Sequence, residues 1–393
     1  MDSTTLHDHY GFSHKQRQIH RNFIKNCKPA TAHFNILHRV TVGLSALHQQ
    51  LLIQQNKVMS PHVAPVTGRN FVQPFQILAR RYRVLYKIGE GSFCQAVCAE
   101  DLYYLERRLV AIKIMAPKFN AIGMQECKTL RYLNKHDNND NTNIVKLINT
   151  FMVGKHFCLV VDYYQGGTPK LPRIVNEQYR LQVLRKLTCQ LLTALMYIRH
   201  MGILHADLKL DNIICTTANT LELRVVDFGN AMSLDEIRDY FETFEVQTLA
   251  YRAPEVLMGL PFGFEIDMWS FGCIVCELWL GHPIFYSSSK QGMIREIVQL
   301  LGPFPNSIYA NGKFFAKYNV RSDLISMNLN GNDKNMADVL RTKRLSKVLK
   351  TNDSNFISFI NHIFEYDPSK RPTPFECLLH PFLASLFPFA LYA

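Results

Sequence analysis

The sequence predicts an α+β fold in which a small β-rich part precedes a larger α-helical part. The first observation is a series of short apolar runs between residues 82 and 115, interrupted by a glycine-rich turn. The second is a change of pattern after residue 162, where leucines recur at helical spacing. The third is composition: 47% of the 393 residues are hydrophobic and 19% are charged, which suits a globular chain.

The individual elements follow from local pattern. The runs that predict strands are, in chain order, Val84-Leu85, Ala96-Val97-Cys98, Leu109 to Met115 and Phe157 to Val161. A helix is expected over Gln125 to Leu133. Another is expected around Leu184, Leu187, Leu191 and Leu195, which share one helical face. Cys273 and Cys276 form a CxxC pair, but they stand in an apolar helical run, which predicts core thiols rather than a zinc or redox site.

Residues 1–80 are predicted to be a basic, His-rich extension. They hold nine Lys or Arg against two acidic residues, and eight of the fifteen His. Apolar residues from Ile36 to Leu51 recur at steps of three and four, which predicts an amphipathic helix over about 36–56 that could dock on a protein partner. Because no dense Lys/Arg run occurs, we expect a solvated extension without direct nucleic-acid binding.

Long apolar segments are missing from the sequence. No run of eighteen apolar residues occurs, so we expect no membrane span. The first ten residues are polar, which predicts no secretory signal. Ten cysteines are scattered without a framework pattern, so we expect a reduced intracellular protein. We also expect a monomer, located in the nucleus or the cytoplasm.

Six segments stand in a fixed order along the chain. They are Gly89-Glu90-Gly91-Ser92-Phe93, Val110-Ala111-Ile112-Lys113, His205-Ala206-Asp207-Leu208-Lys209 with Asn212, Asp227-Phe228-Gly229, Ala253-Pro254-Glu255, and Asp267-Met268-Trp269. Together they resemble the signature set of eukaryotic protein kinases. The resemblance covers about residues 81–384. It implies a bilobal fold, with an N-lobe over 81–162, a C-lobe over 163–384 and ATP in the cleft. A short apolar tail, 385–393, follows.

The nucleotide side of the cleft is expected around the glycine turn. Glycines permit close backbone approach to phosphates. The resemblance implies that Lys113 contacts the α- and β-phosphates and pairs with Glu126. The residues implied to bind ATP are Ile88, Gly89, Glu90, Gly91, Ser92, Phe93, Ala96, Val97, Ala111, Lys113, Val161, Asp162 and Tyr164, the last two in the hinge.

Two positions depart from the glycine-turn pattern. Cys94 replaces its third Gly, and Ala96 replaces its Val. Because Ala96 offers less apolar area to the adenine, we expect ATP binding weaker by about tenfold, not absent. Cys94 is also a candidate for thiol modification if partly exposed.

The chemical centre implied by the resemblance is formed by four residues. Asp207 would orient the substrate hydroxyl and accept its proton, and Lys209 would reach the γ-phosphate. Asn212 and Asp227 would hold Mg²⁺, which prefers oxygen ligands. Two structural roles are also implied: Glu255 and Arg371 as a buried ion pair, and Asp267 as the anchor of the catalytic-loop backbone.

Within kinases, the chain resembles the CMGC group and its DYRK/HIPK branch. Ala206 replaces the usual arginine, which is the His-Ala-Asp form of homeodomain-interacting kinases. Glu245 stands where the branch has an autophosphorylated tyrosine, and Leu249 where it has the arginine that binds it. Either Glu245 supplies a fixed negative charge or this clamp is lost. Since that arginine helps CMGC kinases accept proline after the phosphorylated residue, Leu249 weakens the expectation of proline direction.

Three functions remain open on the sequence. The leading one is an ATP-dependent protein serine/threonine kinase with protein substrates, and with tyrosine autophosphorylation as in DYRK-like kinases. The alternative is a pseudokinase scaffold with weak or no phosphotransfer, favoured by Cys94, Ala96 and the altered activation segment. A small-molecule phosphotransferase of related fold is the third, but such enzymes usually lack the Ala-Pro-Glu segment and Arg371.

Overall fold

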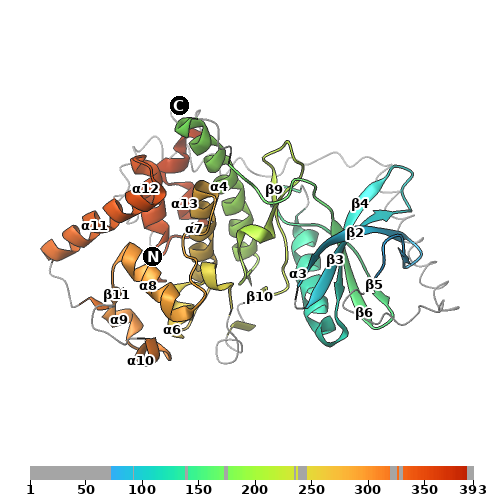
Figure 1. The fold of residues 1–393 in the computed structure, drawn as a ribbon, viewed down its shortest axis with the longest axis horizontal. Coiled ribbons are helices and arrows are strands. Elements are labelled where there is room, and N and C mark those ends of the chain that lie inside the picture. The colour runs from blue at the N-terminus through green and yellow to red at the C-terminus, as the bar shows by residue number, and fades with distance from the viewer. Residues whose placement is uncertain are drawn as a thin grey trace.

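The structure is a computed structural model (Figure 1). It describes residues 72–91, 93–137, 140–171, 176–233, 236–237, 246–318, 325–326 and 331–386. Four features named from the sequence lie outside these ranges: the helix expected over 36–56, Ser92, Glu245 and residues 387–393 of the tail.

The N-terminal lobe is built on a six-stranded antiparallel sheet of order β1-β2-β3-β4-β6-β5. Its strands are β1 (Ile77–Leu78), β2 (Tyr82–Glu90), β3 (Cys94–Asp101), β4 (Arg108–Met115), β5 (Leu147–Val153) and β6 (His156–Asp162). The strands predicted from the sequence are confirmed as β2, β3, β4 and β6, and no prediction covered β1 or β5. One helix, α3 (Asn120–His136), contains the predicted helical segment and packs against β5 and β6.

Alternation along the strands gives this sheet two different faces. On β4, Val110, Ile112 and Ile114 are fully buried in a core of their own. The residues between them, Ala111 and Lys113, point to the opposite face and are half-buried. That second face is the one directed toward the rest of the molecule.

The C-terminal lobe is helical and surrounds two long helices, α4 (Glu177–His200) and α7 (Glu265–Leu280), which contact each other. The four leucines predicted to share a face of α4 are at most 2% exposed. Helix α7 is apolar almost all round and buried, as a central helix must be. Cys273 and Cys276 are buried free thiols within it, which confirms them as core residues.

Shorter elements complete this lobe. The helices are α6 (Pro254–Met258), α8 (Lys290–Leu301), α9 (Asn306–Tyr309), α10 (Phe315–Tyr318), α11 (Gly331–Leu349), α12 (Ser354–Ile363) and α13 (Pro374–Leu378). The strand pairs are β7 (Ile203–Leu204) with β10 (Met232–Ser233), β8 (Ile213–Cys215) with β9 (Leu223–Val225), and β11 (Phe304–Pro305) with β12 (Ile325–Ser326).

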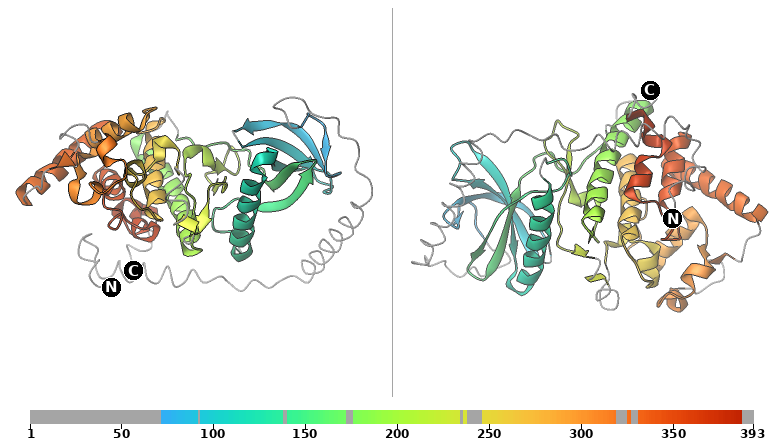
Figure 2. Two further views of the ribbon diagram at one scale, coloured as in Figure 1. Left: turned by 90° about the horizontal axis from the view of Figure 1, so that it is seen from below. Right: turned by 180° about the vertical axis from the view of Figure 1, so that it is seen from behind.

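The arrangement confirms the predicted α+β, two-lobed fold. In all views the sheet and α3 lie at one end of the molecule, and α11 and α12 lie at the other (Figures 1 and 2). The β7–β10 and β8–β9 pairs lie between the sheet and the long helices, so the loops that they carry face the junction of the lobes (Figure 1). Across the described residues, none of the helices combines the length and apolarity needed to cross a membrane.

Candidate active site

Three charged residues from three separate elements meet at the junction of the lobes. Lys113 comes from β4, Glu126 from α3, and Asp227 follows β9. The Nζ of Lys113 lies 2.7 Å from Glu126 Oε2 and 2.7 Å from Asp227 Oδ1. The sequence predicted that Lys113 and Glu126 pair, and the structure brings them together with Asp227.

Burial and charge act against each other in this triad. Burial alone would lower the pKa of Lys113, but the carboxylates of Glu126 and Asp227 outweigh it and hold that pKa above its ordinary value. Burial alone would raise the pKa of Asp227, but Lys113 lowers it to about 2. Lys113 is therefore a cation and Asp227 a carboxylate at neutral pH, which are the forms needed to bind phosphate and a metal cation.

In the variant Asp227→Asn, the thermal unfolding midpoint is expected to fall less steeply with decreasing pH than in the wild type. The folded-state pKa of Asp227, about 2, lies below its ordinary value of 3.8, so its contribution is present above about pH 4 and is lost as the pH falls toward 2. Thermal unfolding midpoints measured over this range, with Asp338→Asn as an exposed control, check this. If the midpoints of the wild type and of Asp227→Asn fall equally steeply over this pH range, this prediction is contradicted.

Asp207 is held at the centre of a dense hydrogen-bond network. Its Oδ1 accepts from the Thr248 N–H at 3.0 Å and from Thr248 Oγ1 at 2.7 Å. Its Oδ2 accepts from Lys209 Nζ at 2.9 Å and, more weakly, from Asn230 Nδ2 at 3.4 Å. The sequence predicted Asp207 and Lys209, whereas Thr248 and Asn230 were not recognised. A substrate hydroxyl that donates to Asp207 must displace one of these donors, and the long Asn230 contact is the weakest.

The loop that carries Asp207 is fixed from beneath. Asp267 of α7 accepts the N–H groups of His205 at 2.8 Å and Ala206 at 3.0 Å, the anchoring role expected for it. Asn212 Nδ2 donates to the Asp207 carbonyl at 2.9 Å. That contact uses the amide nitrogen of Asn212 and leaves its oxygen as the group able to bind a cation. With the Asp227 carboxylate, it forms an oxygen donor set that suits Mg²⁺.

The glycine turn between β2 and β3 borders a space that holds no protein atoms. The Gly91 N–H donates to the Cys94 carbonyl at 2.9 Å. A Cβ placed on Gly89 or Gly91 would meet no atom within 4 Å, so this backbone is open to a ligand. Ile88 and Phe93 are 45% and 44% exposed, and Glu90 forms an ion pair with Lys87.

Strand pairing decides which predicted residues face the junction of the lobes. Ala96 is paired with Lys113, and Ala111 with Val161, so all four lie on the same sheet face. Val97 is instead paired with Ile112 and is buried in the opposite core. The prediction that Val97 lines the nucleotide site is wrong, because neighbouring strand residues point to opposite faces.

The predicted hinge follows β6. The Asp162 side chain binds Arg108 at 3.0 Å, and its N–H donates to the Lys146 carbonyl. The Tyr164 side chain packs against the main core, and burial raises its pKa to about 12. A contact of this hinge with adenine would therefore involve main-chain groups.

Cys94 does not have the environment of a reactive thiol. It is half-buried, and burial raises the pKa of its thiol despite the nearby Lys113. A raised pKa reduces the thiolate fraction that reacts with electrophiles. The modification suggested from its place in the sequence is therefore disfavoured.

Comparison with known proteins decides the family. A family described as "Protein kinase domain" matches residues 82–383. The chain belongs to the protein kinase family. Human "Dual specificity tyrosine-phosphorylation-regulated kinase 4" is 31% identical over 314 residues, which is 78% of this chain and 58% of the relative. "Serine/threonine-protein kinase ppk15" of Schizosaccharomyces pombe is 31% identical over 339 residues, 77% of this chain and 62% of the relative.

A third relative extends the same group. "Dual specificity protein kinase YAK1" of Saccharomyces cerevisiae is 28% identical over 347 residues, which is 77% of this chain and 42% of the relative. Relatives at about 30% identity thus include kinases named for the DYRK and YAK types, which agrees with the resemblance of the motifs to the DYRK/HIPK branch. The chain spans between 42% and 62% of the length of these three relatives.

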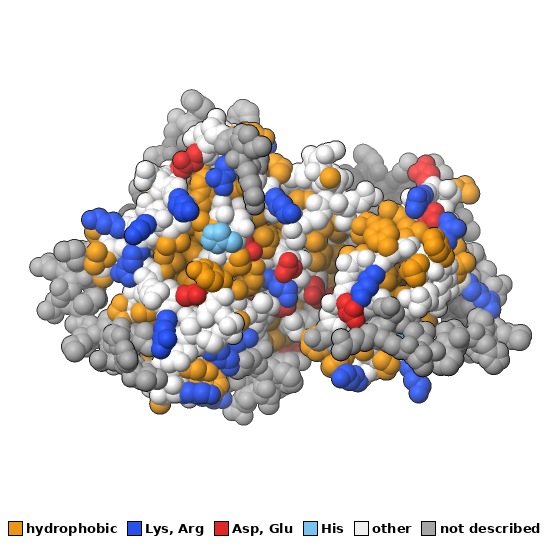
Figure 3. Space-filling view, viewed as in Figure 1, with side chains coloured by type: hydrophobic (Ala, Val, Ile, Leu, Met, Phe, Trp, Pro, Cys, Tyr) orange, Lys and Arg blue, Asp and Glu red, His pale blue; other side chains and the backbone are white. Residues whose placement is uncertain are grey.

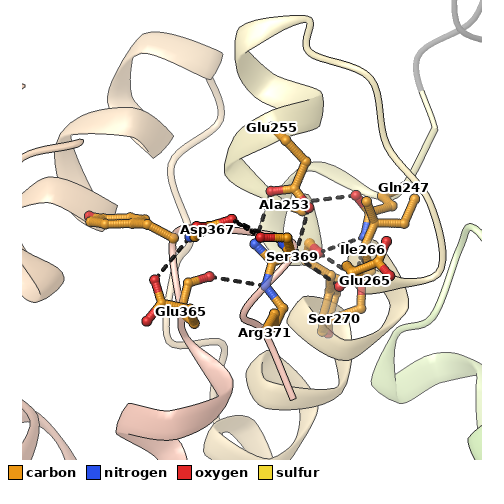
Figure 4. Close-up of polar contacts among 12 residues, drawn as sticks. Gln247, Ala253, Glu255, Glu265, Ile266, Ser270, Glu365, Asp367, Ser369 and Arg371 are labelled. Atoms are coloured by element: carbon orange, nitrogen blue, oxygen red, sulfur yellow. Dashed lines mark hydrogen bonds and ion pairs between the residues drawn. The ribbon is translucent and has the colours of Figure 1, made fainter. Parts of the chain in front are cut away.

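Gln247, which lies between positions 245 and 249 and was not singled out from the sequence, anchors the segment before Ala253 (Figure 4). Its backbone φ is +67°. Its Nε2 donates to the Ile266 carbonyl at 2.9 Å and to Ser270 Oγ at 2.7 Å, and its Oε1 accepts the Ala253 N–H at 3.0 Å. This buried amide thus ties the segment to α7, in the absence of an arginine at Leu249.

The Gln247 carbonyl has a partner of its own. It accepts hydrogen bonds from Arg252 Nε at 3.2 Å and Nη2 at 2.8 Å. This arginine lies three positions after Leu249 and stabilises a backbone conformation that costs about 1 kcal/mol or more for a residue other than glycine.

The ion pair expected between Glu255 and Arg371 is present and completely buried (Figure 4). Arg371 Nη1 lies 2.6 Å from Glu255 Oε1, and Nη2 lies 3.0 Å from Oε2. Arg371 also donates to the carbonyls of Glu265 and Glu365. The pair joins the start of α6 to the chain before α13.

Proposed function

We propose that this kinase is catalytically active and transfers the γ-phosphate of ATP to serine or threonine hydroxyls of proteins, with Mg²⁺ as its cofactor. The observation that carries the proposal is the Lys113 ammonium in contact with both Glu126 and Asp227. A scaffold that no longer bound nucleotide would have no need to keep three charged groups together at a partly buried site.

Each residue contributes a separate physical effect. Lys113 supplies a fixed positive charge for the phosphates, and the buried Glu126 holds that charge in place. Asp227 and Asn212 offer oxygen ligands to Mg²⁺, which supplies charge neutralisation of the phosphates when bound. Asp207 orients the acceptor hydroxyl and takes up its proton, while Lys209, 2.9 Å away, offsets charge on the transferred group.

The proposed preference for serine and threonine as phosphate acceptors rests on similarity to the protein kinase family. The Asp207-x-Lys209 pair is of the serine/threonine form. Two of the named relatives are called dual-specificity kinases, which supports additional tyrosine autophosphorylation. Since Glu245 occupies the position of the branch's autophosphorylated tyrosine, any such event here takes place elsewhere.

The test is transfer of labelled phosphate from ATP with Mg²⁺ to a generic protein substrate by the purified chain. Phosphate on serine or threonine is expected. Folded protein that binds ATP without transferring phosphate would favour the pseudokinase alternative. Transfer to a small molecule but never to protein would favour the third function.

Gln247→Ala is expected to lower kcat by roughly tenfold or more. The change leaves the Ala253 N–H buried without its partner, at about 1–3 kcal/mol, and removes a donor from the Ile266 carbonyl, next to Thr248, which holds Asp207. Steady-state phosphotransfer measures this effect.

The matched variant Glu245→Ala is expected to leave kcat unchanged within about twofold, since Gln247 anchors this segment without a negative charge at residue 245. A loss in Glu245→Ala as large as that in Gln247→Ala would instead support the fixed-charge hypothesis and contradict the anchoring role.

A further inference from the structure

A groove with a volume of about 510 Å³ lies between α11 and α12, at the end of the C-lobe farthest from the sheet (Figure 1). Eight of its nine lining residues are polar, and they come from both helices and the turn between them. The lining residues are Thr342, Lys343, Ser346, Lys347, Asn352, Ser354, Ile357, Ser358 and Asn361. Two are lysines and none is acidic.

The two helices form a fixed pair beneath the groove. Arg341 of α11 donates to the Asn361 carbonyl at 3.0 Å and to the Phe364 carbonyl at the end of α12. Ser346 Oγ donates to the Thr351 carbonyl at 2.8 Å, which closes the turn. These contacts hold the walls in place, so a ligand would meet a preformed site.

Positive charge is concentrated on α11. Residues 341–350 contain five Lys or Arg and no acidic residue. Lys343 and Lys347 are exposed and one helical turn apart, so their ammonium groups project along the same wall. Figure 3 shows Lys and Arg side chains gathered over α11. Within the described ranges, neither lysine is within ion-pair distance of a carboxylate.

The nearby carboxylates face other partners. Asp353, which caps α12, accepts the Phe356 N–H at 2.7 Å and lies 3.6 Å from Arg185. Glu177 of α4 binds Thr351 Oγ1. The groove therefore keeps a net positive lining.

We propose that this groove docks an acidic, Asp/Glu-rich segment of a partner protein. Carboxylates would pair with Lys343 and Lys347, and the peptide backbone would bind the hydroxyl and amide groups of the lining. Charge complementarity excludes the chain's own N-terminal extension as occupant, because residues 1–80 carry nine Lys or Arg against two acids. The groove would add affinity for a partner without forming part of the active site.

The test measures binding of a fluorescein-labelled, glutamate-rich peptide to the full chain by anisotropy, beside a glutamine-rich peptide of equal length. The wild type is expected to bind only the glutamate-rich peptide, and less tightly as salt is raised. In Lys343→Glu/Lys347→Glu the affinity is expected to fall at least about tenfold. The matched control Lys135→Glu/Lys155→Glu makes the same change of net charge at exposed N-lobe positions and is expected to lose less than about twofold.

Three results would overturn the proposal. They are no binding by the wild type, equal losses in the two double variants, and binding of a phosphoserine peptide alone. If Lys343→Glu/Lys347→Glu does not fold, Lys343→Gln/Lys347→Gln replaces it, with the same expected direction. Phosphotransfer to a generic substrate is expected to be unchanged in the groove variants, so failure here is distinct from failure of the proposed kinase activity.

Discussion

Asp207→Asn is expected to lower phosphotransfer by about 10³-fold while the protein stays folded. Removing a positioned general base costs about 10²- to 10⁴-fold in rate. An amide cannot accept the substrate proton, and its NH₂ group would face either the Thr248 donors or Lys209, all of which need an acceptor. The change therefore removes the proton acceptor and also disturbs the positions of Lys209 and Thr248.

Initial rates with labelled ATP and a protein substrate measure this loss, and the thermal unfolding midpoint checks the fold. Asp338→Asn makes the same chemical change at an exposed site of α11 and is expected to keep wild-type activity. If Asp207→Asn retains more than about a tenth of the wild-type rate, Asp207 is not the base. If the wild type is itself inactive yet is stabilised by ATP, the scaffold alternative is correct.

How far the sequence predicts this site depends on the kind of contact involved. Lys113 and Glu126 pair as expected, and Asp227 joins them, because the kinase motifs imply one topology and so place the elements that carry these residues next to one another. Within that topology, the face of a single residue depends on strand register. Val97 was misassigned because it directly follows Ala96 on one strand, so only one of the two can face the nucleotide, and the pairing of Ala96 with Lys113 decides which.

Contacts from a side chain to distant main-chain groups leave no local signal in the sequence. The Gln247 side chain forms hydrogen bonds with the Ile266 carbonyl and the Ala253 N–H, which lie 19 and 6 residues away along the chain. Nothing in the sequence marks this glutamine as buried. The groove beside α11 was missed for a different reason. Residues 303–355 are polar and lack strong periodicity, so the sequence predicted neither the helix nor the cationic wall that it forms with α12.

Arg371→Met is expected to destabilise the protein by about 3–5 kcal/mol, the cost of removing one member of a buried ion pair. Both partners are 0% exposed, so the Glu255 carboxylate would remain without its cation in a site that water does not reach. The carbonyls of Glu265 and Glu365 would lose a donor as well. The loss should appear as a lower urea midpoint with an unchanged slope, because the surface exposed on unfolding hardly changes.

The double variant Glu255→Met/Arg371→Met separates the charge effect from packing. Since it removes both charges, it is expected to be more stable than Arg371→Met alone, although the carbonyls of Glu265 and Glu365 still lose the Arg371 donor. The matched surface change Lys370→Met, one residue away, is expected to cost less than about 1 kcal/mol because its partner Asp367 stays solvated. If the effects of Arg371→Met and of Glu255→Met, each measured alone, simply add in the double variant, the contact between Glu255 and Arg371 contributes nothing beyond shape, and α6 is held by its apolar neighbours alone.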